Sequence, residues 1–198
     1  MNHLCKYSFS FLFLALISSS SAVFAQSTGD PRTPERKIPD VQLSDGQIVN
    51  LLKTVDTGEI KIAKAVETRT QNKDVKAFAE RMIQDHQKSL TNNEKLAKKI
   101  HVPFEPSEQS VALQESVKRD LSSLASAKDP GELDRVYAES QYKAHETALN
   151  LLDNSMVTSA KNPELKKELT QVHEVVQKHS DQAEELKKKL ASDAKVKK

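Results

Sequence analysis

The sequence predicts an all-α protein, built as a four-helix bundle with a short extra helix in a long central connection. Two observations support this fold class. Only 4 of the 198 residues are Gly and none is Trp, which excludes the glycine-rich loops of nucleotide-binding folds and argues against a turn-rich β sandwich. Apolar side chains recur at steps of three and four over long segments without proline, as amphipathic helices require.

Residues 1–25 are expected to be a cleaved secretory signal peptide rather than part of the fold. Phe9 to Ile17 form an apolar run of about nine residues, far short of the roughly 20 that span a membrane, and Val23-Phe24-Ala25 resembles a cleavage site. Cleavage removes Cys5, the single cysteine, which excludes a disulfide scaffold and a thiol nucleophile. We therefore expect a periplasmic protein without a transmembrane anchor, and association with the outer membrane is an open alternative.

The 173 residues that follow the predicted signal peptide are expected to form one domain with two flanking segments. Residues 26–43 contain three prolines and few apolar side chains, and are predicted to be a flexible leader. The bundle is expected over residues 44–190, and a basic tail over residues 191–198. The near-neutral balance of 30 basic and 28 acidic residues, with few aromatic side chains after the signal peptide, argues against a nucleic-acid partner.

The first two long helices are predicted from their capping residues. Ser44, followed three residues later by Gln47, resembles a capping box and starts a helix that we expect to end near Thr70. Asn72 can cap a second helix, whose apolar stripe runs to Ile100. The short turn between them implies that the two helices are antiparallel neighbours.

Three further helices are predicted after this pair. Ser107 is expected to cap a shorter helix with Val111 on its apolar stripe, and Asp129, followed by proline, starts a long helix that runs to about Ala160. Asn162, also followed by proline, starts the last helix. The long connection in the middle fits a ferritin-like arrangement, in which the crossover returns the chain along the bundle, and an up-down-up-down order with an inserted helix is the alternative.

One polar residue interrupts the apolar stripe of each long helix. These residues are Glu59, His86, His145 and His179. Counted from the turns, each lies near the middle of its helix, so the crossover topology brings all four into one layer. Three imidazoles and one carboxylate can bind one divalent metal ion such as Zn, Fe or Mn. A hydrogen-bonded network that fixes helix register is the alternative interpretation.

Other residues near this layer carry secondary hypotheses. Asp85 is expected to be a further ligand or a partner that fixes a histidine tautomer. Asp134 and Tyr137 are expected to form a polar network two to three turns away. Gly58 costs about 1 kcal/mol relative to Ala inside a helix, and its missing side chain would let a neighbouring helix approach. No catalytic triad is evident from residue order or spacing, and we assign no catalytic residue.

The same positions carry a resemblance to a known family. The matching elements are Gly58-Glu59, the segment from Phe78 to His86, Gly131-Glu132-Leu133-Asp134, Tyr137, Gln141, His145 and His179. Over about residues 44–190 the sequence resembles the exported bacterial domain-of-unknown-function family 4142, a ferritin-like helical-bundle family. Leu133 and Glu174 depart from the family pattern, which usually has Phe and often Pro there. The resemblance implies the fold and export, and it supplies no activity.

The ferritin-like di-iron pattern is missing from the chain. Those sites take Glu from two helices and Glu-x-x-His from two others, whereas Ile83, Tyr142 and Val176 stand three residues before the three histidines. A di-iron oxidase or an iron-storing protein is therefore not expected, which leaves a mononuclear site or a metal-free bundle.

Two functional hypotheses follow for the exported chain. The first is a non-enzymatic binding or envelope stress-related protein whose partner is an unidentified envelope protein. The alternative is a metal-binding or redox protein with a mononuclear Glu/His site in the bundle core.

Overall fold

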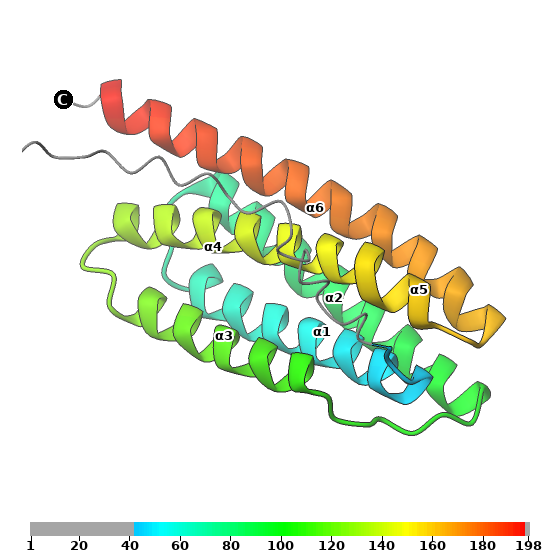
Figure 1. Cartoon of the computed structure of the whole chain (residues 1–198). Coiled ribbons are helices and arrows are strands. Elements are labelled where there is room, and N and C mark those ends of the chain that lie inside the picture. Colours follow the sequence, from blue (N-terminus) through cyan, green and yellow to red (C-terminus); the bar gives the residue numbers. More distant parts are fainter. Residues whose placement is uncertain (1–41, 197–198) are drawn as a thin grey trace, which may run out of the picture. The chain divides into compact units, whose positions relative to one another are not determined.

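The structure, a computed structural model, describes residues 42–196 of the chain (Figure 1). The predicted signal peptide, most of the predicted leader and residues 197–198 lie outside this range. The described residues form helices and no strand, which confirms the all-α prediction. The helices are α1 (Asp45–Glu67), α2 (Lys73–Lys99), α3 (Glu108–Ala125), α4 (Pro130–Leu151), the π-helix η1 (Leu152–Met156), α5 (Val157–Ser159) and α6 (Pro163–Val196).

The helix starts lie where their capping residues predict. The Ser44 hydroxyl accepts a hydrogen bond from the main-chain N–H of Gln47, and the Gln47 side chain accepts one from the main-chain N–H of Ser44. Asn72, Ser107 and Asp129 cap α2, α3 and α4 through their side chains. Each such cap stabilises a helix by about 1 kcal/mol, so local sequence defines where these helices begin.

Hydrogen bonds between segments show which helix ends lie together. At one end the Asp45 carboxylate accepts from the main-chain N–H groups of Lys161 and Asn162 at 2.8 and 3.0 Å. At the other end the Thr70 hydroxyl donates to Asp134 at 2.6 Å. It follows that α1, α3 and α6 run in one direction and α2 and α4 in the other, with α3 returning the chain along the bundle (Figure 1).

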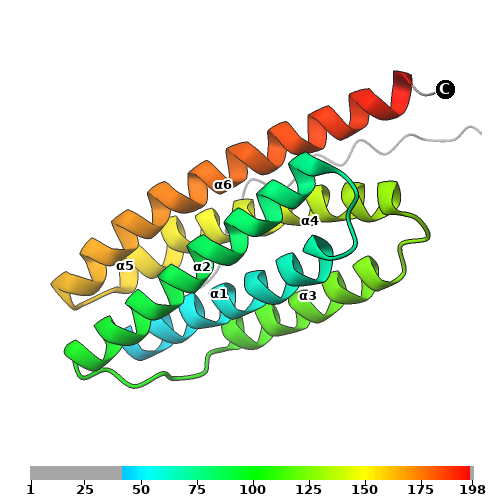
Figure 2. The ribbon, with the colours of Figure 1, turned by 180° about the vertical axis from the view of Figure 1, so that it is seen from behind.

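The long helices pack as two pairs, α1 with α2 and α4 with α6. The helix α3 lies against α1 on the outside of the bundle, and α2 faces α6 on the other side, as the view from behind shows (Figure 2). The contact between α2 and α6 is much less extensive than the contact within either pair. Within residues 42–196, one long side of the bundle is therefore covered by an extra helix, whereas the α2 and α6 side is not.

The bundle has two apolar clusters with a polar layer between them. One cluster contains Met82, Leu124 and Leu133, and the other contains Leu52 and Leu169. Between them every long helix carries buried polar side chains. We call these the polar layer: Asp56, Glu59, His86, Gln141, His145 and His179.

The helix α3 approaches α1 closely at Gly58. A Cβ atom added to Gly58 would lie 2.5 Å from Cγ2 of Val117 on α3, which is far inside van der Waals contact. The missing side chain therefore lets a neighbouring helix approach, as the sequence suggested. Val111 on the same helix is 53% exposed although its spacing predicted a buried position, because α3 lies at the edge of the bundle and buries a narrow face.

Candidate metal centre

Three histidines from three helices meet in the middle of the polar layer. His86 comes from α2, His145 from α4 and His179 from α6, and their exposed fractions are 5%, 2% and 2%. One ring nitrogen of each lies within 4.8 Å of the corresponding nitrogens of the other two. The ring centroids are 5.3 to 6.0 Å apart. Three imidazoles thus converge on one small volume that solvent does not reach freely.

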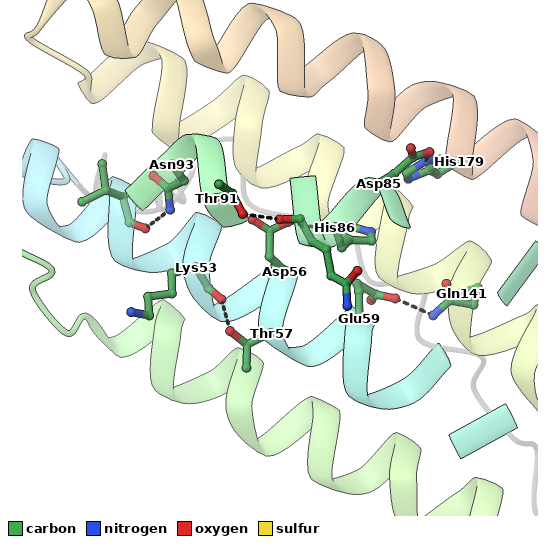
Figure 3. A network of polar contacts seen from close by, with 12 residues as sticks. Lys53, Asp56, Thr57, Glu59, Asp85, His86, Thr91, Asn93, Gln141 and His179 are labelled. Atoms are coloured by element: carbon green, nitrogen blue, oxygen red, sulfur yellow. Dashed lines mark hydrogen bonds and ion pairs between the residues drawn. The ribbon is translucent and has the colours of Figure 1, made fainter. Parts of the chain in front are cut away.

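Each imidazole is held from its outer side by an oxygen atom. Nδ1 of His145 lies 2.8 Å from the main-chain carbonyl oxygen of Gln141. Nδ1 of His86 lies 2.9 Å from Oδ1 of Asp56, and Nε2 of His179 lies 3.0 Å from Oδ2 of Asp85 (Figure 3). Histidines that bind metal ions commonly have such a carbonyl or carboxylate partner on the second ring nitrogen.

These outer partners determine where the lone pairs point. A carbonyl oxygen only accepts hydrogen bonds, so the neutral ring of His145 carries its hydrogen on Nδ1 and its lone pair on Nε2. A carboxylate likewise only accepts, so His179 donates from Nε2 to Asp85, and His86 donates from Nδ1 whenever Asp56 is ionised. The remaining nitrogens are Nε2 of His86, Nε2 of His145 and Nδ1 of His179, and all three are buried without a hydrogen-bond partner among the described residues.

Burial keeps two of these rings uncharged at neutral pH. It lowers the pKa of His86 to about 4, against the opposing charge of Glu59. It also lowers the pKa of His179 to about 4, against the effect of the hydrogen bond that Asp85 accepts from its Nε2. Neutral imidazoles are the form that binds metal ions. Burial also raises the pKa of Asp56 to about 7.

The structure separates Glu59 from the three histidines with which it was grouped. Its carboxylate is buried, and Oε2 accepts a hydrogen bond from the side-chain amide of Gln141 at 2.7 Å (Figure 3). The group of nitrogens within 4.8 Å does not include a Glu59 oxygen. In this geometry Glu59 joins α1 to α4 and contributes negative charge beside His86.

Two of the three secondary candidates lie away from the histidines. Asp85 hydrogen-bonds to His179, as the second of its two expected roles requires. Asp134 instead accepts from Thr70 at the turn after α1. The Tyr137 ring packs against Phe78 with centroids 5.9 Å apart, and its buried hydroxyl has no partner among the described residues. Asp134 and Tyr137 therefore share no hydrogen bond.

Two residues of the site were given no role from the sequence: Asp56 was not singled out, and Gln141 was named only as a position of the family resemblance. Asp56 is 3% exposed and stands four residues after Leu52 and three before Glu59. That spacing places it on the buried face of the helix, so it was a signal available in the sequence. Gln141 stands four residues before His145, where the α-helix brings its carbonyl beside the imidazole.

Comparison with known proteins identifies a family for the chain. A family model described as "Domain of unknown function (DUF4142)" matches residues 30–186. No curated protein and no solved structure matches the chain. Among residues 42–196, no helix is both long and apolar enough to cross a membrane. The match confirms the family resemblance found in the sequence, and the family description assigns no activity.

Proposed function

The chain belongs to the family described as Domain of unknown function (DUF4142), and we propose that this member is a metal-binding protein that holds one divalent transition-metal ion. The ligands are Nε2 of His86, Nε2 of His145 and Nδ1 of His179. The observation that carries the proposal is that these three buried nitrogens converge and find no hydrogen-bond partner in the described part of the chain. A buried polar atom left unpaired costs about 1 to 3 kcal/mol, and a shared metal ion removes that cost for all three at once.

The ligand set indicates which metals fit. Imidazole nitrogens bind Zn²⁺, Fe²⁺, Co²⁺ and Cu²⁺ well, whereas Mg²⁺ and Ca²⁺ prefer oxygen ligands. Three protein ligands leave a fourth coordination position for water or another small ligand. We therefore propose a mononuclear site that prefers Zn²⁺ or Fe²⁺ to the oxygen-binding cations.

We also propose that the bundle has the ferritin-like connection. The support is that α2 and α4 run in the same direction and that α3 occupies the connection between them. A di-iron centre does not accompany it, because the three histidines lack the Glu-x-x-His spacing of those sites.

Export to the periplasm remains part of the proposal and rests on the signal-like pattern of residues 1–25.

Elemental analysis of protein purified without chelator tests the metal site. We expect about one transition-metal ion per chain, lost on substitution of His86, His145 or His179 by Ala. His173→Ala is the matched control, since His173 lies on α6 beside Asp153, is 37% exposed at its side chain and lies outside the cluster. Wild-type protein that stays metal-free after dialysis against Zn²⁺, Fe²⁺ and Co²⁺ would overturn the proposal.

The visible spectrum of the Co²⁺ form gives an independent test of the geometry. Co²⁺ bound by three imidazoles and one further ligand absorbs more strongly than the octahedral hydrated ion, because a tetrahedral site lacks a centre of symmetry. We expect this spectrum in the wild type and in His173→Ala, and its absence in His145→Ala.

A further inference from the structure

A pocket of about 390 Å³ opens on the side of the bundle where α2 faces α6. Its lining includes Asp56 from α1, Asp85 and His86 from α2, and His179 and Gln182 from α6. Two of the three proposed ligands therefore border the pocket, whereas His145 does not. The opposite side of α1 is covered by α3. Among the described residues, this pocket brings the surface next to two of the three histidines.

Two buried oxygen atoms in this pocket have no hydrogen-bond partner of ordinary geometry among the described residues. Asp56 is 3% exposed and its Oδ1 faces His86, while its Oδ2 is one of the two, although the Ser89 hydroxyl lies close to this carboxylate. Oε1 of Gln182 is also buried without a partner. The amide oxygen of Gln182 and the ionised form of Asp56 are acceptors, so the groups that can satisfy them are hydrogen-bond donors or a cation with its water shell.

A third oxygen donor lies at the mouth of the pocket. The Asp85 side chain is 41% exposed and bridges from α2 to His179 on α6 (Figure 3). Its carboxylate is therefore in contact with solvent and with a proposed metal ligand at the same time. An incoming ion that reaches Asp85 is one side chain away from the imidazole of His179.

We infer that this pocket is an entrance site for a hydrated divalent cation, with Asp85 as the first ligand and Asp56 as the second on the way to the three histidines. The inference rests on the proposed metal site and adds the path by which the ion arrives. The ion exchanges water molecules for carboxylate oxygens and then for imidazole nitrogens, so no covalent bond is made or broken and no electron is transferred.

Acidic and basic side chains both line the pocket, and the two kinds of charge act on a cation in opposite directions. Asp56, Asp85 and Glu168 are acidic, whereas Arg81, Lys88 and Lys178 are basic. Negative charge at an entrance raises the association rate of a cation, and positive charge lowers it. Removal of Asp85 and removal of Arg81 must then change the rate in opposite directions.

The test is the association rate of Zn²⁺ with metal-free protein, measured by stopped flow in competition with a coloured chelator. Asp85→Asn keeps an oxygen that can accept from His179 and removes the charge. We expect its association rate constant to fall about tenfold, and any effect of the altered contact with His179 to appear separately in the dissociation rate constant. Arg81→Gln is expected to bind faster than the wild type.

Asp181→Asn is the matched control, because Asp181 is an exposed acid two residues from His179 on α6 that does not line the pocket. We expect its association rate to match the wild type. If Asp85→Asn also associates at the wild-type rate and loses affinity only through faster dissociation, Asp85 merely orients His179 and the entrance site is refuted. That outcome leaves the metal site intact, whereas a metal-free wild type at equilibrium would overturn both.

Discussion

Replacing His145 by Leu is expected to make the metal-free protein more stable. His145 is 2% exposed, and its buried Nε2 has no hydrogen-bond partner within residues 42–196. In the wild type the unpaired atom destabilises the metal-free fold by about 1 to 3 kcal/mol. Leucine removes this penalty but also removes one hydrogen bond to Gln141, worth about 1 kcal/mol. The Gln141 carbonyl retains the main-chain N–H of residue 145, as in any α-helix. With the added apolar burial of Leu, the net expectation is a gain of about 1 to 2 kcal/mol.

Saturating metal is expected to reverse this order. An ion that binds only the folded state at 100 times its dissociation constant stabilises it by about 2.7 kcal/mol. The wild type gains this amount in Zn²⁺, whereas His145→Leu has lost one of three ligands and gains little. At about 2 to 4 °C per kcal/mol for a domain of this size, the wild-type Tm rises by about 5 to 10 °C and passes that of the variant.

Thermal unfolding followed by circular dichroism at 222 nm, in EDTA and in Zn²⁺, measures both effects. His173→Leu controls for the loss of a histidine outside the cluster, and its Tm is expected to differ little from the wild type in either condition. The reasoning is refuted if His145→Leu is less stable than the wild type in EDTA, or if Zn²⁺ raises both Tm values equally.

Two further substitutions test the helix approach and the outer hydrogen bonds. Gly58→Ala is expected to lower the free energy of unfolding by about 1 to 3 kcal/mol, measured in urea, since the added carbon would overlap Val117. Gly131→Ala is the control, because the nearest atom to its added carbon is 3.3 Å away. Equal urea midpoints for the two variants would contradict the close packing of α3 on α1. Asp56→Asn is expected to weaken Zn²⁺ binding about 10- to 100-fold, because it removes the carboxylate that holds His86. Competition with a chelator measures the affinity, and an unchanged affinity would show that this hydrogen bond does not support the site.

Features that depend on neighbouring residues in the chain were predictable. The capping residues of α1 and α2, Ser44 and Asn72, act on main-chain groups two or three residues away, so the sequence contains both partners. The three histidines were also found from the sequence alone, because each interrupts an apolar stripe whose period is fixed by the helix.

Features that depend on side-chain direction were not predictable. Counting along an axis at 1.5 Å per residue places Glu59 at the level of the histidines, but it does not distinguish a carboxylate that faces a metal from one that faces Gln141. Asp56 was missed because the neighbouring Val55 was counted as the buried apolar residue of that helical turn. Val111 is exposed because α3 lies outside the bundle, and the spacing of apolar residues within α3 does not reveal that position.

The order of the helices also bears on how the chain would assemble around the metal ion that we propose. The three histidines come from α2, α4 and α6. The chain must fold back through α3 before His145 on α4 can approach His86 on α2. An unfolded chain presents single, distant imidazoles, which bind a divalent ion weakly. The proposed site would join His86 to His145 and His145 to His179, and so close two long loops of the chain as a cross-link does. Loop closure lowers the conformational entropy of an unfolded chain that keeps the ion bound. Release of the ion should therefore accompany the opening of the bundle, which makes metal content a measure of how much of the protein is folded.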